Sequence, residues 1–115
     1  MALNDIEKKR SENVLAAYIE KIRPDPSFRN KLDVSFRITD QSVEIFEIRP
    51  VFRAPKEKIE IPVAKATFVR SQNIWKVYWR RADLKWYSYS PVPTVKAIHD
   101  FVALVEQDQH ACFWG

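Results

Sequence analysis

The chain has 115 residues, of which 46% are hydrophobic and 30% charged, and its net charge is +4. This length and balance predict a single globular domain over residues 1–115 with one core. No apolar run approaches the roughly 18 residues of a membrane helix, and no secretory signal is evident, so we expect a cytoplasmic protein without membrane association. The one cysteine excludes an internal disulfide framework, and the one glycine excludes Gly-rich phosphate loops.

An amphipathic helix is predicted over residues 4–22. Apolar side chains recur there at i, i+3, i+4 and i+7 spacing and would line one face of the helix. They are Leu15, Tyr18, Ile19 and Ile22. Pro24 and Pro26 end the helix, because proline lacks an amide hydrogen and restricts the residue before it. Residues 27–31 then form a short turn or helical loop.

Strand patterns fill the centre of the chain. Apolar and polar residues alternate over 32–39, which is typical of a strand with one buried and one solvated face. The run 43–49 is apolar on both faces, which predicts a more central strand that Pro50 closes or bends. Residues 54–60 are the most polar connection, and we expect a mobile loop there. Further strands are predicted at residues 63–70, 74–81 and 84–89, with turns at 71–73 and 82–83.

A second amphipathic helix is predicted near the C-terminus, with Pro93 in its first turn. Its apolar face would combine Val95, Ile98, Phe101, Val102, Leu104 and Val105. The chain ends in apolar residues, and we expect Phe113 and Trp114 to dock onto the domain instead of fraying. Short connections between strands favour an antiparallel meander. The predicted fold is therefore α+β: an antiparallel sheet of about five strands with an N-terminal and a C-terminal helix packed on one face.

Aromatic and basic residues gather in the second half of the predicted sheet. Residues 74–89 hold three of the four Trp, three of the four Tyr and four of the nineteen basic residues. Residues 61–90 carry a net charge of +5, so the basic excess lies on the central strands and not on a tail. An excess of this kind steers anionic partners, although Lys and Arg on strands also serve solubility.

Alternation sorts the predicted strand at 74–81 into two faces. One face, which we expect in the core, carries the large apolar residues Trp75, Val77 and Trp79. The other face carries Lys76, Tyr78 and Arg80 and is the candidate contact surface, which Lys85, Tyr87 and Tyr89 extend if the register allows. The full set of candidate binding residues is Arg49, Lys65, Lys76, Tyr78, Arg80, Arg81, Lys85 and Tyr87.

One carboxylate and one cation share a strand face. Glu47 and Arg49 are two residues apart, so we expect a structural ion pair. Together with Lys65 and an aspartate in one cleft they would suit a phosphate-ester hydrolase, which is a minor alternative. The weakness of this alternative is that arginine stands where metal-dependent nucleases use a lysine, whose pKa shifts readily.

Two other pairs of residues have simpler explanations. Arg81 and Asp83 flank the hairpin turn and are expected to form an ion pair that stabilises it. His110 and Cys112 are two possible metal ligands, whereas a structural zinc site needs four. We therefore expect no metal, no cofactor and no catalytic residue.

Four strings occur together in this chain: EIRP at 47–50, PVAKAT at 62–67, WKVYWRRADLKW at 75–86 and CFWG at 112–115. As a set they resemble a family of small bacterial proteins known only as a domain of unknown function. The resemblance covers nearly the whole chain and implies a compact bacterial cytoplasmic protein, without implying an activity, substrate or cofactor. Where the family pattern carries His after the third Trp of the hairpin, this chain has Tyr87, which weakens any case for a histidine-based site.

Two functions of different classes remain open. An uncovered sheet face and the apolar pair Phe113 and Trp114 favour a protein-interaction or assembly module, with a protein partner or a homo-oligomer. The basic, aromatic strands favour binding of nucleic acid or another polyanion, because cations pair with phosphates and aromatic rings stack on bases.

Overall fold

The computed structural model describes residues 2–114. Helix α1, Asp5–Ile22, begins at a capping box in which Asn4 and Glu7 each accept the other's backbone N–H through their side chains. The helix ends before Pro24, as predicted, and Pro26–Phe28 then forms a short 3₁₀ turn, η1. Neither α1 nor any other helix in this part of the chain is long and apolar enough to cross a membrane.

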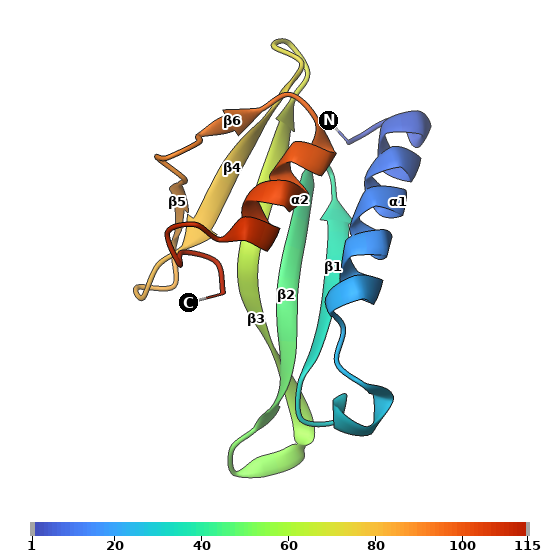
Figure 1. The fold of residues 1–115 in the computed structure, drawn as a ribbon, viewed down its shortest axis with the longest axis vertical. Helices are drawn as coiled ribbons and strands as arrows, with labels where there is room; N and C mark the ends of the chain where they lie inside the picture. Colours follow the sequence, from blue (N-terminus) through green and yellow to red (C-terminus); the bar gives the residue numbers. More distant parts are fainter. Residues whose placement is uncertain (1, 115) are drawn as a thin grey trace.

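Within the described residues, six strands form one antiparallel sheet (Figure 1). They are β1 Asp33–Thr39, β2 Ser42–Val51, β3 Ala54–Val69, β4 Ile74–Arg80, β5 Trp86–Ser88 and β6 Thr94–Val95. The order β1-β2-β3-β4-β5 confirms the predicted meander, and β6 returns to pair with β4. Asp40 and Asn73 take positive φ in two of the turns, a conformation that Asp and Asn tolerate better than most residues.

Both helices lie on one face of this sheet (Figure 1). Helix α1 packs along β1, and α2, Ile98–Gln107, lies beside α1 and contacts β4. The fully buried residues of the core come from both layers and include Leu15, Val43, Ile45, Val77, Phe101 and Val105. The predicted α+β architecture, with its helices on one face, is confirmed.

The prediction of a mobile loop over residues 54–60 is wrong, because these residues begin β3, and Ala54 and residues 58–60 pair with β2 across an irregularity after Pro50. Ile59 lies opposite Arg49, and the connection between the two strands is only Phe52 and Arg53. Strand β4 joins β3 no earlier than Ala64, so the first part of β3 has a neighbour on one side only. Its charged side chains therefore stay in water, and polar composition there indicates an edge strand.

The start of the second helix also differs from the prediction. Helix α2 begins at Ile98, where the Asp100 carboxylate accepts the backbone N–H of Ala97 at 3.2 Å. Val95 belongs to β6 and lies opposite Trp75, so it reaches the core from a strand and not from a helix. The Pro93 carbonyl accepts the N–H of Val77 at 3.0 Å, which holds this segment extended against β4.

The C-terminal segment docks onto the domain, as predicted. Asp108 ends α2 in the left-handed conformation, and its carboxylate accepts the backbone N–H groups of Phe113 at 3.0 Å and Trp114 at 2.9 Å. The Phe113 side chain is 7% exposed, and its ring centroid lies 4.8 Å from that of Tyr89. Trp114 is partly buried against the same core.

Candidate functional site

The sheet face opposite the helices is left to solvent, and the strand register identifies its residues. Residues directly opposite each other on antiparallel strands share a face. Lys65 lies opposite Glu44 on one side and Tyr78 on the other, and Arg80 lies opposite Trp86. With the alternation along each strand, this defines an open face made of Arg37, Glu44, Phe46, Lys65, Lys76, Tyr78, Arg80 and Trp86.

Lys65 is the centre of this open face. Its ammonium group lies 5.1 Å from the ring centroid of Tyr78 and 5.1 Å from that of Trp86. Both distances are within the range of cation–π attraction, so the two rings hold the lysine across three neighbouring strands. All three side chains are half-buried, which leaves part of each ring available to a ligand.

A second cation–aromatic contact lies on the β1 side of the open face. The guanidinium of Arg37 stacks over the ring of Phe46 at 4.3 Å from its centroid and also forms an ion pair with Glu60. Phe46 is 5% exposed even though no helix covers this face. Arginine here acts as a lid on an aromatic ring, and its charge is already matched by a carboxylate.

The remaining cations of the open face have no such partner. Within residues 2–114, Lys65, Lys76 and Arg80 take part in no ion pair. The Nε atom of Arg80 is buried and makes no hydrogen bond to any described residue. A buried guanidinium nitrogen without an acceptor costs stability.

The structure divides the eight predicted binding residues into three groups. Lys65, Lys76, Tyr78 and Arg80 come together on the open face. Arg81 and Lys85 lie in the turn between β4 and β5, and Lys85 is exposed. Arg49 and Tyr87 lie on the helix-covered side of the sheet.

The expectation that Tyr87 and Tyr89 extend the Lys-Tyr-Arg face is wrong. Tyr87 lies opposite Trp79, whose neighbour two residues earlier is the core residue Val77, so the register turns Tyr87 toward the helices. Tyr89 is 2% exposed and belongs to the core. Trp86 takes their place on the open face, because a shift of one residue along a strand changes the face.

The turn between β4 and β5 is stabilised differently from the prediction. Among the described residues no ion pair joins Arg81 to Asp83. Arg81 instead stacks over Tyr87 at 4.6 Å from the ring centroid, and the Tyr87 hydroxyl donates to the Asp83 carboxylate. That hydrogen bond lowers the pKa of Asp83 and raises the pKa of Tyr87.

Four residues of the open face are absent from the predicted binding set: Arg37, Glu44, Phe46 and Trp86. Glu44 and Phe46 sit in a run that is apolar on both faces, so alternation does not assign either of them to a face. Trp86 stands next to Tyr87, and two adjacent aromatic residues can be assigned to faces only when the register with β4 is known. The alternation over 32–39 did place Arg37 on the solvated side.

Comparison with known proteins gives the family of this chain. The sequence model of the family described as Domain of unknown function (DUF3024) matches residues 3–115. The chain belongs to this family. No curated protein and no solved structure matches it.

The DUF3024 chain does not gather the residues that a phosphate-ester hydrolase would need. Glu47 and Arg49 form the predicted ion pair, at 3.2 Å between carboxylate and Nε, on the helix-covered side of the sheet. Lys65 lies on the opposite face, so the three residues share no cleft. Across residues 2–114 of this DUF3024 protein, no three His, Cys, Asp or Glu side chains group together as metal ligands would.

Proposed function

We propose that this protein binds single-stranded nucleic acid through the open face. The observation that carries the proposal is the placement of Lys65, Lys76 and Arg80, without ion partners in the described part of the chain, beside the half-exposed rings of Tyr78 and Trp86. Phosphates would pair with the cations, and unpaired bases would stack on the rings. An antiparallel sheet with helices on one side offers such a strand a platform of several side chains on the other side.

The charge pattern supports a phosphate backbone as the ligand. The open face carries four cations, and Arg37 is already paired with the Glu60 carboxylate, which leaves three cations beside Glu44. The three others lie on adjacent strands β3 and β4, where Lys76 is opposite Thr67 and Lys65 is opposite Tyr78. Because these cations are spread along two strands, they match the repeated charges of an extended polyanion better than the single charge of a small anion.

The test is a fluorescence anisotropy titration with labelled DNA and RNA of about 16 nucleotides, at salt concentrations between about 50 and 200 mM. We expect affinity to fall with salt and to be lost in the double variant Lys76→Glu/Arg80→Glu. The matched control is Lys8→Glu/Lys9→Glu, which makes the same charge change on the exposed outer side of α1. Circular dichroism melts of each variant, and Lys76→Glu alone, separate lost binding from lost folding.

An equal loss of affinity in both double variants would mean that net charge alone attracts the nucleic acid. Binding that does not depend on salt, or no binding at all, would contradict the proposal.

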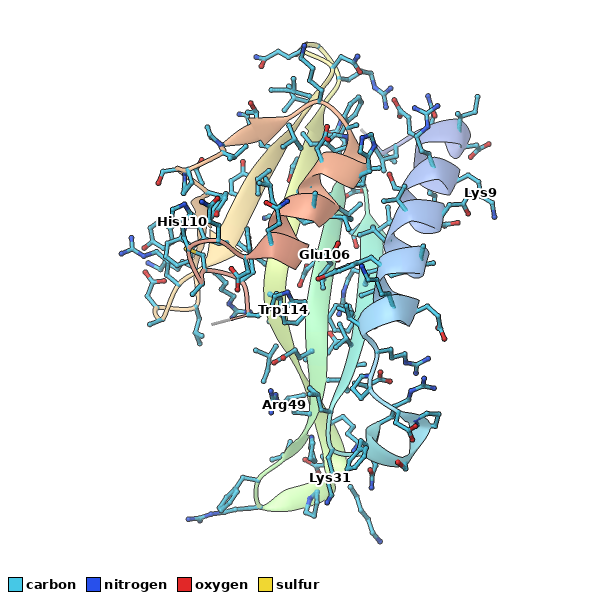
Figure 2. All side chains as sticks on the ribbon, in the orientation of Figure 1. Lys9, Lys31, Arg49, Glu106, His110 and Trp114 are labelled. Carbon is cyan, nitrogen blue, oxygen red and sulfur yellow. The ribbon has the colours of Figure 1, made fainter. Side chains whose placement is uncertain are left out.

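A second candidate is a protein-interaction module, and a groove on the helix-covered side favours it. The groove has a volume of about 320 Å³ and is lined by Ile22, Leu32, Trp114, Glu47 and Glu106. Figure 2 labels Glu106 in the last turn of α2 and Trp114 below it, and both line the groove. The apolar walls suit an apolar side chain of a protein segment. The two carboxylates pair with Arg49 and Lys21, so a cation that follows this side chain would bind them by displacing those partners.

An array of immobilised peptides of that composition tests this candidate. Binding that Trp114→Ala and Glu106→Lys both weaken would support it, and binding that neither change affects would exclude this groove.

A further inference from the structure

The hairpin of β2 and β3 projects beyond the rest of the molecule as a two-stranded arm. Strand β1 leaves β2 at Ile48, and β4 joins β3 only at Ala64. We define the arm as residues 49–60, where neither β1 nor β4 pairs with the hairpin and the register of β2 and β3 is interrupted between Pro50 and Val51. Figure 1 shows the arm extending past the ends of both helices.

The arm carries an apolar ring at its tip. The side chain of Phe52 is 95% exposed, although the two-residue connection places it between paired strands. Burial of a phenylalanine side chain stabilises a protein by about 2 kcal/mol or more, and Phe52 forgoes this contribution. The stability of the fold therefore does not explain why a phenylalanine stands here. Pro50 and Pro55 flank the tip and restrict its backbone, which keeps the ring extended away from the domain.

The arm and the segment beside it are rich in cations. Arg53, Lys56 and Lys58 belong to the arm, and Lys31 lies beside it after η1 (Figure 2). The Lys58 ammonium donates to the Asn30 carbonyl at 2.6 Å, which fixes this segment against the arm. None of these four cations forms an ion pair with another described residue, and Glu57 is the one carboxylate between Arg53 and Lys58.

We propose that the arm enters the major groove of double-stranded DNA. That groove is about 12 Å wide and admits a two-stranded β-ribbon, whereas the major groove of duplex RNA is too narrow for side chains. Phe52 would contact base edges, and Arg53, Lys56 and Lys31 would reach the phosphates on either side. This site is separate from the open face and does not rest on the function proposed above.

Anisotropy with a labelled DNA duplex of about 20 base pairs tests this site. The variant Arg53→Gln/Lys56→Gln should reduce the slope of log K against log salt by about 1.8, because each lost phosphate contact removes about 0.9. Phe52→Ala should lower affinity roughly fivefold with the slope unchanged, since it removes apolar contact and no charge. All three side chains are exposed, so unchanged melting temperatures are expected.

The matched control is Lys8→Gln/Lys9→Gln, which removes the same charge from α1, where Lys9 lies far from the arm (Figure 2). An equal effect of this control, equal binding of duplex RNA, or no binding of duplex DNA would overturn the proposal. Phe52-dependent binding to vesicles of phosphatidylcholine and phosphatidylserine, without duplex binding, would assign the arm to membranes and overturn it as well.

The assignments of the open face and of the arm can be disproved independently of each other. The variant Lys76→Glu/Arg80→Glu should lose single strands and keep the Phe52-dependent part of duplex binding. Loss of single-strand binding by the arm variants, with no effect of the open-face variant, would overturn both assignments.

Discussion

The ammonium group of Lys65 on β3 lies 5.1 Å from the ring centroid of Trp86 on β5, across the intervening strand β4. The lysine therefore reaches over its neighbour Tyr78 to a ring that the sequence places far away. This contact joins the charge and the aromatic surface of the open face into one unit. It also makes Trp86 the residue whose replacement best separates stacking from charge.

Trp86→Ala should weaken binding of single-stranded nucleic acid by about 1–3 kcal/mol, the contribution of one stacked base. The salt dependence should remain, because no phosphate contact is removed. Trp86→Phe is the control, since a smaller ring retains most of the stacking, and anisotropy at fixed salt measures both. A Trp86→Ala protein that binds like the parent would show that bases do not stack on this ring.

Phe46 gives a prediction about stability on the same face. Its ring is 5% exposed and lies under the guanidinium of Arg37 at 4.3 Å. Phe46→Ala should therefore lower the free energy of unfolding by about 3 kcal/mol, as for a core phenylalanine. Arg37→Ala removes the lid together with the exposed ion pair to Glu60 and should cost about 0.5–1 kcal/mol. Urea denaturation measures both changes, and a loss below about 1 kcal/mol for Phe46→Ala would mean that this ring is effectively solvated.

The order of elements follows from local patterns in the sequence, whereas the pairing of faces does not. Alternation over 32–39 predicts β1, and the spacing from Leu15 to Ile22 predicts the buried face of α1, because each signal lies within one element. The start of β3 was missed because exposed edge residues have a loop's composition. Val95 was assigned to a helix because its contact with Trp75 is made through β6, which no local pattern indicates.

In the candidate site, too, local patterns assign some residues to a face, whereas the face of others depends on the register between strands. Alternation within β4 places Lys76, Tyr78 and Arg80 together, and only the register with β3 adds Lys65 to them. Trp86 and Tyr87 exchange faces relative to the expectation, because their assignment depends on a hairpin turn in which Leu84 takes a positive φ of 65°. That conformation is uncommon for leucine, so the sequence gives no sign of the turn that sets the register.

The docked C-terminus gives a third prediction. Phe113→Ala removes a 7% exposed ring that packs against Tyr89, and it should lower the free energy of unfolding by about 3 kcal/mol. Phe113→Leu keeps most of the apolar volume and should cost less than half as much. Thermal melts followed by circular dichroism compare the two. If Phe113→Ala melts at the parent temperature, the segment contributes nothing to the fold.

Acid stability depends on the ion pair that joins the end of α1 to the start of β1. Arg23 donates to both Asp33 oxygens, at 2.7 and 2.8 Å, and these hydrogen bonds hold the pKa of Asp33 below its ordinary value of about 3.9. A carboxyl group with a lowered folded-state pKa stabilises the protein above its unfolded pKa, and this contribution is lost as the pH falls through the folded pKa. Asp33→Asn should therefore cost about 1 kcal/mol near pH 7 and progressively less below about pH 4. Melting temperatures of both proteins between about pH 2 and pH 7 measure the difference.

The control is Glu57→Gln, which changes an exposed carboxylate without an ion pair in the described chain and should show no such pH-dependent difference in melting temperature from the parent. A difference between Asp33→Asn and the parent that persists at low pH would exclude the ion pair as its cause.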